Sequence, residues 1–592
     1  MANKKISDFP VTATLGDDDI FLIDQSGSTS SVAYKTVSTS ISGLVTNSIQ
    51  TIIDNLNPTN EDKVDPAPEQ GFIKQLAKMR PSKYNVAAIT STNRVITWGA
   101  SNGTEASKGG KLSIGFASSN RTSPERYIRV PFHANWTTTG GPTGIDYLDE
   151  YPNVKILDLY WNAFGAMALL DDGSCWVAGY NSGGLGVGAD PGNPLAGYRP
   201  TGGFVKVAFS TPGTFIKRIE CSSDNTALNG IFAALDSTDS LWVWGTTADG
   251  VFGTADLTLA ETISTPRKLT SMTIVDFSSP IIKNYTSGVA FENEIFDFSI
   301  NSTEATGTAI SVVLKNNKLY ISGDNSKGQR GTGFTTGSGL FNQAKTAALT
   351  YVENAVAVER GIYSGFHNHY YISTSGAVWA CGRNISNYSG GSGNDISWTG
   401  NNSFVSTSYF VSTTWPSNMI AEKILTVGYD WPTVFALCKD STTDTKTVYS
   451  WGYNHTIGNC GTNSTAFGVN VPTQVVYRAG LATYVALNNV VDIFVSDNTG
   501  TSTAVCIVDK EGYAYTAGAN NYNDPPLFLN ANTQFFIRVP LKNVVGAILG
   551  GDVGAHRWNI FLLKNGTTWG MGDAAELIFG GSDLLRHPAR LI

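Results

Sequence analysis

The stretch Leu241-Trp242-Val243-Trp244-Gly245 decides the fold, because it recurs along the chain as a short apolar and aromatic strand closed by a glycine. Each copy follows a turn and precedes a polar, glycine-rich loop. Eight copies align on the closing glycine, at steps of 54 to 80 residues. A constant strand motif with variable spacing between its copies is typical of repeat architectures that take insertions in their loops. The closing glycines are Gly99, Gly179, Gly245, Gly323, Gly382, Gly452, Gly518 and Gly572.

The residues around each copy repeat as well and indicate about four strands per unit. In the second unit, the apolar runs 154–159 and 166–170 come before the turn Asp171-Asp172-Gly173. The eighth unit has the same order and the turn Lys564-Asn565-Gly566. Such turns between β-forming residues indicate tight hairpins. A fourth candidate strand, such as 204–207, follows the loop. Four strands per repeated unit are typical of a β-propeller.

The repeated unit resembles that of the regulator of chromosome condensation family. The tail of the family's unit, with its Gly, Asn and Gly-Gln-Leu-Gly elements, has its counterparts in residues 179–186 and 323–331. The resemblance covers about residues 71 to 592 and implies a propeller. The family usually builds seven blades, whereas this chain carries eight copies of the motif. We therefore predict an all-β propeller of eight four-stranded blades, with seven blades as the alternative.

Two expectations concern the packing of this propeller. The motif tryptophans are predicted to lie between blades, each contributing about 2–3 kcal/mol by burial. The first unit begins at Phe72 without an outer strand before it, and the chain ends on His587-Pro588-Ala589-Arg590-Leu591-Ile592. We expect these last residues to pair into the first blade and close the ring, which removes a free sheet edge. The tryptophans are Trp98, Trp176, Trp244, Trp379, Trp451 and Trp569.

Residues 1 to about 70 do not carry the repeat. Two short strands, 19–24 and 31–35, are predicted to form a hairpin, and a polar helix with a narrow apolar stripe is predicted to follow from about Ser38. Such a stripe needs a partner, either the hairpin or copies of itself.

The opening Lys5-Ile6-Ser7-Asp8-Phe9-Pro10 and the later Asp18-Asp19-Ile20-Phe21-Leu22-Ile23 resemble N-terminal attachment segments of bacteriophage tail fibres and related adhesins. This resemblance implies an attachment and oligomerisation segment over residues 1–56. A linker over 57–70 then leads into the propeller at 71–592. The residues expected to attach to the virion are Ile6, Phe9, Ile20, Phe21, Leu22, Ile41, Leu44, Val45, Ile49 and Ile52.

Residues with the spacing of a catalytic or metal site are few. His367-Asn368-His369 has a metal-like spacing, and His455 lies near Cys460 without a second pair to complete a zinc set. Nucleophile-elbow, phosphate-loop and zinc-protease motifs are absent from the sequence. The six cysteines are far apart and are predicted to be buried, reduced residues. We predict a protein that is not an enzyme, with no catalytic, cofactor or metal residues.

The composition of the chain disfavours some classes of binding partner. The chain has 592 residues, 15% of them charged, and a net charge of -8. The acidic balance disfavours a nucleic-acid surface, which needs clustered Lys and Arg. No apolar run is long enough to cross a membrane, and no secretion signal is visible. Abundant Gly, Ser, Thr and Asn are typical of β-rich extracellular or viral structural proteins.

These observations predict a bacteriophage structural protein, a tail-fibre or baseplate-associated receptor-binding adhesin, located in the virion tail and assembled in the host cytoplasm. Its N terminus is expected to bind other tail or baseplate proteins, and its propeller loops a host-surface glycan or protein. Alternatives are a capsid fibre or decoration protein, and a cellular chromosome-condensation-type regulator binding a small GTPase. The lack of a basic tail disfavours the regulator. Candidate sugar- or protein-binding aromatics are Trp136, Trp398, Trp415, Trp431 and Tyr409.

Overall fold

The computed structural model describes residues of the second of two units into which the chain divides, Met1–Ile52 and Ile53–Ile592. The hairpin and helix expected over residues 1–56, the linker and all ten expected attachment residues lie outside the described residues. The described residues are 72–79, 85–100, 121–122, 128–133, 136–137, 141–142, 153–161, 165–181, 184–187, 199–200, 203–223, 230–247, 251–253, 261–301, 309–336, 338–359, 368–384, 399, 407–427, 432–454, 458–480, 483–495, 504–518, 533–551, 557–573 and 584–591.

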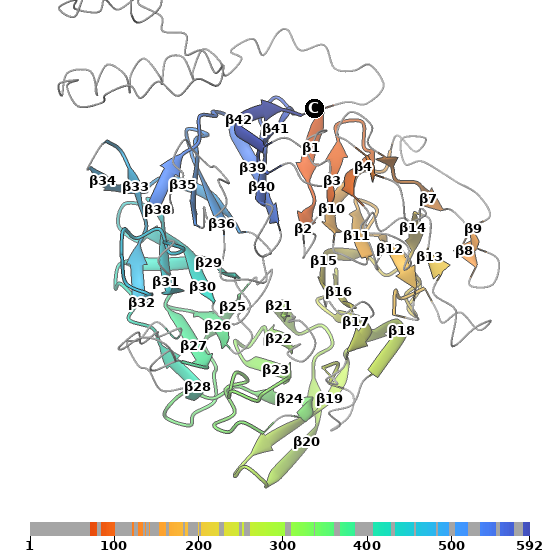
Figure 1. Ribbon diagram of the computed structural model, residues 1–592. Helices are drawn as coiled ribbons and strands as arrows, with labels where there is room; N and C mark the ends of the chain where they lie inside the picture. Colours follow the sequence, from red (N-terminus) through yellow and green to blue (C-terminus); the bar gives the residue numbers. More distant parts are fainter. Residues whose placement is uncertain are drawn as a thin grey trace, which may run out of the picture. The chain divides into compact units, whose positions relative to one another are not determined.

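Eight four-stranded antiparallel sheets form the blades of a propeller (Figure 1), which confirms the expected number of blades and excludes seven. In each blade the first strand lies innermost and consecutive strands pair side by side. Blade 1 has β1 (Ile73–Leu76), β3 (Asn85–Thr90), β4 (Val95–Ala100) and β5 (Arg121–Thr122); blade 2 has β10 (Ile156–Trp161), β11 (Gly165–Leu170), β12 (Cys175–Asn181) and β14 (Phe204–Lys206); blade 3 has β15 (Ile216–Ser223), β16 (Gly230–Asp236), β17 (Leu241–Thr247) and β18 (Glu261–Lys268); blade 4 has β21 (Ile295–Asn301), β22 (Ala309–Leu314), β23 (Leu319–Gly323) and β24 (Ser338–Gln343).

The second half of the ring repeats this order. Blade 5 has β25 (Ala355–Val358), β26 (Asn368–Ser373), β27 (Val378–Gly382) and β28 (Thr407–Ser412); blade 6 has β29 (Met419–Val427), β30 (Thr433–Asp440), β31 (Lys446–Tyr453) and β32 (Gly468–Gln474); blade 7 has β35 (Val490–Val495), β36 (Ala504–Asp509), β37 (Ala514–Gly518) and β38 (Thr533–Arg538); blade 8 has β39 (Val544–Gly551), β40 (Arg557–Leu563), β41 (Thr568–Asp573) and β42 (Leu584–Arg590).

The connections between blades add further strands. The hairpin β19 (Ser271–Phe277)–β20 (Lys283–Ala290) extends blade 4, and β33 (Val476–Arg478)–β34 (Tyr484–Ala486) extends blade 7. In both cases the first hairpin strand pairs in parallel with the outer strand of the blade. The remaining short strands are β2 (Lys78–Met79) beside β10, β6 (Ile128–Arg129) beside β4, β7 (Phe132–His133) beside β14, β13 (Arg199–Pro200) beside β12, and the pair β8 (Trp136–Thr137)–β9 (Gly141–Pro142).

The closing glycine of every motif copy lies at the end of a third strand and has a positive φ, between 95° and 137°. L-residues rarely adopt this conformation, which is open to glycine. In β17, a Cβ on Gly245 would lie 2.0 Å from the carbonyl oxygen of Gly230 in the adjacent β16. The glycine is therefore required by the backbone at this point, and its recurrence in the sequence reports a recurring strand geometry.

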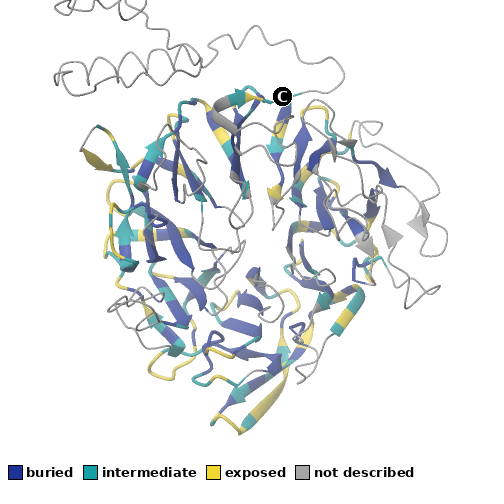
Figure 2. Ribbon diagram, in the orientation of Figure 1, coloured by how far each residue is buried: buried dark blue, intermediate teal, exposed yellow. Residues whose placement is uncertain are grey.

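The hydrophobic core lies in a series of clusters between neighbouring blades, visible as dark blue strands in Figure 2. Trp98, Trp244 and Trp451 are fully buried there, as expected. Trp176, Trp379 and Trp569 are half-buried and pack at the edges of their clusters. The Trp244 indole donates to the carbonyl of Leu185 in blade 2's loop at 3.1 Å, so the buried N–H is satisfied.

An asparagine after the motif fixes the polar loop that follows it. The side-chain amide of Asn325 donates to the carbonyls of Phe334 and Thr336, and its oxygen accepts from the N–H of Arg330. Asn454 makes the equivalent contacts in blade 6, donating to Ser464 and Ala466. Both side chains are fully buried. The asparagine of the resembled family therefore has a structural role here, since it satisfies loop backbone groups that no strand pairs.

The ring does not close as expected from the sequence. The C-terminal β42 pairs with β41 and is the fourth strand of blade 8, while blade 1 has its own outer strands. Blades 8 and 1 join instead by packing, and the N–H of Ile73 donates to the carbonyl of Gly566 at 2.9 Å. Ile216 and Gly173 make the same bond between blades 3 and 2, also at 2.9 Å. The prediction of strand exchange was wrong because the terminal residues resemble an outer strand, and blade 8 itself needs one.

Candidate functional site

The innermost strands share a local irregularity that builds the candidate site. In all eight blades the pairing of the first strand with the second skips one residue, directly after a buried aliphatic residue. Such a β-bulge turns the skipped side chain away from the regular pleat. We call these positions the bulge ring; they are Lys74, Leu157, Lys217, Phe296, Val356, Glu422, Val491 and Val545.

Half of the bulge ring is apolar and exposed, while Lys74, Lys217 and Glu422 are charged and Val356 is half-buried. Leu157, Phe296, Val491 and Val545 each expose between 52% and 57% of their surface. They lie at the end of the propeller that carries the turns between second and third strands. There the N–H of the residue before a bulge donates to a turn of the preceding blade, as Ile73 does to Gly566 and Val544 does to Gly512. Four exposed large apolar side chains at equivalent positions of different blades make this end of the propeller a candidate contact site.

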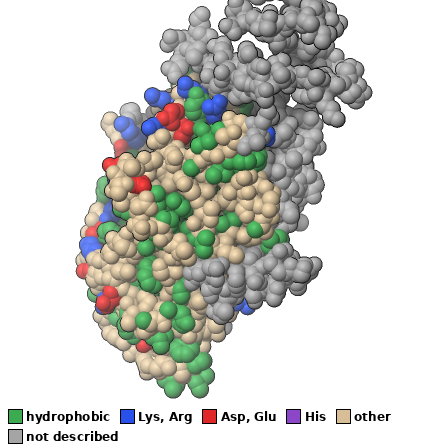
Figure 3. Space-filling model, turned by 90° about the vertical axis from the view of Figure 1, so that its left-hand side faces the viewer, with side chains coloured by type: hydrophobic (Ala, Val, Ile, Leu, Met, Phe, Trp, Pro, Cys, Tyr) green, Lys and Arg blue, Asp and Glu red, His purple; other side chains and the backbone are tan. Residues whose placement is uncertain are grey.

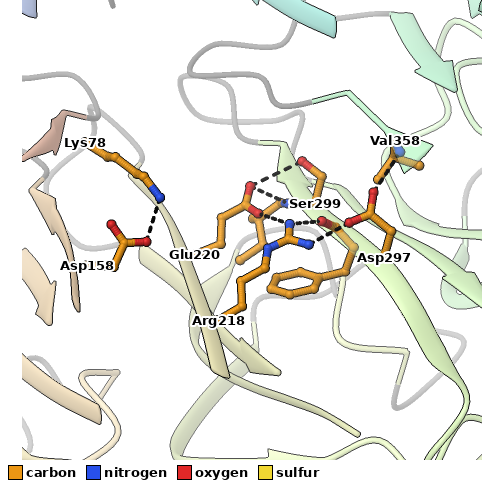
Figure 4. Close-up of polar contacts among 9 residues, drawn as sticks. Lys78, Asp158, Arg218, Glu220, Asp297, Ser299 and Val358 are labelled. Atoms are coloured by element: carbon orange, nitrogen blue, oxygen red, sulfur yellow. Dashed lines mark hydrogen bonds and ion pairs between the residues drawn. The ribbon is translucent and has the colours of Figure 1, made fainter. Parts of the chain in front are cut away.

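The residue after the bulge is polar in six of the eight blades, and ion pairs at this level join neighbouring blades. Lys78 of β2 pairs with Asp158 of blade 2 at 2.6 Å. Lys423 of blade 6 pairs with Asp492 of blade 7 at 2.9 Å. Between them lies the most buried pair, Arg218 of blade 3 with Asp297 of blade 4, at 2.6 Å (Figure 4).

The Arg218 guanidinium is the centre of a network that spans three blades. It donates to Asp297 and to Glu220, and it lies 4.2 Å from the ring centroid of Phe298. Glu220 also accepts from the hydroxyl of Ser299 at 3.2 Å. The other Asp297 oxygen accepts from the N–H of Val358 in blade 5 at 3.0 Å. Figure 4 shows these groups pointing toward one another from β15, β21 and β25.

The surroundings of the network shift the pKa values of Arg218 and Asp297. Burial alone lowers the pKa of Arg218, but the carboxylates of Glu220 and Asp297 outweigh it, and the pKa is raised. Burial raises the pKa of Asp297 despite the opposing effect of Arg218. The side chains of Glu220 and Asp297 expose only 1% and 7% of their surface. These two acids therefore hold blades together, and they are not presented to a substrate as hydrolytic carboxylates are.

The histidines and the cysteine considered as metal ligands in the sequence do not form a described site. His367 and His455 lie outside the described residues. His369 is buried in β26, with Nδ1 3.1 Å from the Ser311 hydroxyl of blade 4, and Cys460 is buried in the core with a pKa raised by burial. No group of three His, Cys, Asp or Glu side chains able to hold a metal occurs in the part of the chain that the structure describes.

His369 makes the stability of the propeller depend on pH. Burial, and next to it the charge of Arg330, lowers its pKa from 6.5 to about 3. Between these values the unfolded chain binds a proton that the folded chain does not, so stability falls as pH decreases from 6.5. We expect His369→Asn to remove this part of the acid sensitivity, on the order of 2 kcal/mol between pH 6.5 and 5. Urea unfolding of both proteins at the two pH values measures it, and parallel pH profiles would contradict it.

The candidate aromatic platform is only partly described. Trp398 and Trp431 lie outside the described residues, as does the side chain of Trp136. Trp415 packs against Trp451 and Tyr449, and its indole donates to the carbonyl of Met419 at 2.7 Å. It therefore belongs to the cluster between blades 5 and 6 and not to a surface platform. Tyr409 lies in β28 and is half-buried.

Comparison with known proteins gives likenesses of fold. No protein-family model and no curated protein sequence matches the chain. Similar solved structures include Prp20p from Saccharomyces cerevisiae, at 15% identity over 67% of this chain and 75% of that chain, with a TM-score of 0.38. Human WBSCR16 is similar at 14% identity over 72% and 84%, with a TM-score of 0.41. Yeast RCC1 (Prp20) bound to Kap60 is similar at 15% identity over 90% and 89%, with a TM-score of 0.40.

Among the residues that the structure describes, no helical segment has the length and hydropathy needed to cross a bilayer.

Proposed function

We propose that the protein is a bacteriophage structural protein, a tail-fibre or baseplate-associated receptor-binding adhesin without enzymatic activity. Residues 1–56 attach it to other tail or baseplate proteins, and the propeller contacts a glycan or protein of the host surface. It resides in the virion tail and is assembled in the host cytoplasm. The observation that carries the proposal is the opening 5–10 together with 18–23, which resembles tail-fibre attachment segments and precedes a propeller.

The described geometry supports a binding role. The charges of the inner strands pair with one another, as Arg218 does with Glu220 and Asp297, so they stabilise the ring. The exposed residues of the bulge ring and of the peripheral hairpins include large apolar side chains such as Phe296, Ile281 and Tyr484. A rigid ring that presents apolar contact residues on stable strands is suited to holding a partner, and binding residues are most often placed on such scaffolds.

Deletion of residues 1–56 tests the division of labour. We expect particles purified from producing cells to contain the full-length chain at the tail, and the shortened chain to be absent from particles because its attachment residues are missing. Peptide mass spectrometry and electron microscopy of labelled particles measure incorporation. The shortened chain should keep the melting temperature of the full-length propeller, since the described core lies entirely beyond residue 71.

A matched control separates attachment from folding. Ile49→Asp changes the predicted apolar stripe, whereas Val545→Asp places the same charge on the bulge ring, which is exposed. The first variant should be lost from particles and the second retained. A shortened chain that still enters particles contradicts the proposal. Location on the capsid would favour a decoration protein, and absence from all particles together with binding to a small GTPase would favour a cellular regulator.

A further inference from the structure

An Asn-Gly pair lies in the turn of blade 8 that contacts blade 1. The sequence has three such pairs, at residues 102–103, 229–230 and 565–566, and only the last lies wholly within the described residues. Asn565 and Gly566 belong to the turn between β40 and β41. An asparagine followed by glycine can lose its side-chain amide, because the unhindered backbone nitrogen of glycine is able to attack the side-chain carbonyl carbon.

The folded turn holds both reacting groups in hydrogen bonds. The N–H of Gly566 donates to the carbonyl of Leu563 at 2.9 Å. Oδ1 of Asn565 accepts from the N–H and from the hydroxyl of Thr567, at 3.1 and 2.8 Å. The Gly566 nitrogen can attack Cγ of Asn565 only after its bond to Leu563 opens. The rate of the reaction therefore depends on how often this turn opens.

The first residues of blade 1 keep the turn closed. Ile73 donates its N–H to the carbonyl of Gly566 at 2.9 Å, and a Cβ on Gly566 would lie 2.3 Å from Cβ of Phe72. Phe72 is itself fixed, since its N–H donates to the Ser91 hydroxyl at 3.1 Å and its carbonyl accepts from the Ser91 N–H at 2.6 Å. We call the contact of Phe72 and Ile73 with Gly566 the closing joint. Opening of the turn and opening of the closing joint are therefore linked.

The turn lies at the surface, where water is available for hydrolysis. Lys564 is exposed and Asn565 is half-buried. The turns of other blades carry charged residues, among them Lys510 and Glu511, and Figure 3 shows charged side chains gathered along one edge of the propeller. An imide formed in this turn would thus be accessible to solvent.

We propose that Asn565 is a site of spontaneous amide loss, and that the reaction takes place when the closing joint opens and then hinders its closure. The Gly566 nitrogen forms a bond to Cγ of Asn565 and gives up its proton, and ammonia leaves, so that a five-membered imide is formed. Water then adds to either carbonyl of the imide and gives aspartate or isoaspartate. One water is consumed and one ammonia released. The inference uses only the described propeller and is independent of the proposed function.

The two products have different consequences for the closing joint. Aspartate fits the turn, because Asp172 at the equivalent position of blade 2 accepts from the N–H and the hydroxyl of Ser174 at 2.8 and 2.6 Å. In isoaspartate the main chain runs through the side-chain carbons and gains one atom before Gly566. The added atom displaces Gly566 from Ile73, so isoaspartate is the product that weakens the joint.

Incubation of the full-length protein at mildly alkaline pH, followed by peptide mass spectrometry, tests the site. We expect Asn565 to convert to aspartate and isoaspartate, while Asn316 stays intact. Asn316 is the internal control, because it has the equivalent turn position in blade 4 but is followed by Asn317, whose N–H donates to Leu314 at 2.9 Å. The same incubation in urea shows that Asn565 reacts when unfolded. Conversion in urea alone, or equal conversion of Asn316, would overturn the proposal.

A pair of phenylalanine variants tests the link to the closing joint. Phe72→Ala should make the conversion of Asn565 about tenfold faster, which corresponds to about 1.4 kcal/mol in the opening equilibrium. Phe215→Ala is the matched control, because the Phe215 ring covers Gly173 between blades 3 and 2 as Phe72 covers Gly566. It should leave the rate at Asn565 unchanged. Equal rates in Phe72→Ala and the wild type would contradict the link.

The melting temperature separates the effect of the added backbone atom from that of the new charge. Protein enriched in isoaspartate by incubation should melt below fresh protein. Asn565→Asp carries the same charge on an unaltered main chain and should melt at the wild-type temperature. If Asn565→Asp melted as low as the incubated protein, the lengthened main chain would not be the cause of the weaker joint.

Discussion

Gly245→Ala is expected to cost more than about 4 kcal/mol of folding free energy, a large part of the stability of a typical domain. The new Cβ would lie 2.0 Å from the carbonyl oxygen of Gly230, and the backbone has a φ of 123° that alanine rarely adopts. Both colliding atoms belong to the framework of paired strands, so relief requires β16 and β17 to separate. Urea unfolding followed by tryptophan fluorescence measures the loss.

Gly213 provides the matched control for this substitution. Its φ of 75° is also positive, but no atom lies within 4 Å of an added Cβ. Gly213→Ala therefore introduces the left-handed strain without the collision and should cost about 1–2 kcal/mol. If both variants lost the same stability, the close strand approach would not be the reason that glycine recurs in the motif.

Arg218→Met is expected to cost about 3–5 kcal/mol at neutral pH, because it leaves two buried carboxylates without their cation. Glu220 and Asp297 expose 1% and 7% of their side chains, so water cannot replace the guanidinium. Burial already raises the pKa of Asp297, and removal of Arg218 raises it further. The loss should therefore become smaller as pH falls and Asp297 takes up a proton, which unfolding at neutral and acidic pH measures.

Two controls define the origin of this loss. Lys268→Met breaks an ion pair with Glu292, whose side chain is 46% exposed, and should cost less than about 1 kcal/mol. The triple variant Arg218→Met/Glu220→Gln/Asp297→Asn removes the charges together and should recover much of the stability. If the triple variant were no more stable than Arg218→Met alone, the uncompensated charges would not be the cause.

The fold could be predicted from the sequence because its strongest constraint is local. Each motif copy ends in a glycine that the backbone requires, as at Gly245, and each loop begins with residues such as Asn325 that fix it. These signals lie within a few residues of one another, so insertions in the longer loops do not remove them. The motif tryptophans recur with the same strand, and Trp98, Trp244 and Trp451 are buried between blades as expected.

The candidate site could not be predicted because its contacts are distant in sequence. Arg218 and Asp297 are 79 residues apart, and Lys423 and Asp492 are 69 apart. First strands such as Ile156-Leu157-Asp158 and Ile295-Phe296-Asp297 show one polar residue after two apolar ones. That pattern does not predict a bulge or an ion pair between blades. The available signal was an apolar pair at the start of the first strand in five of the eight units, and an ordinary strand shows the same pattern.

The way the ring closes has a consequence for how the protein is made. Blade 8 takes its four strands from 544–590, and blade 1 takes its four strands from 73–122. Each blade can therefore pack against the preceding one as the chain leaves the ribosome, and the last step is the docking of blade 8 on blade 1 through Ile73 and Gly566. A chain stalled on the ribosome before blade 8 would have seven ordered blades in an incomplete ring. Limited proteolysis of such stalled chains would show protected blades long before the circle is complete.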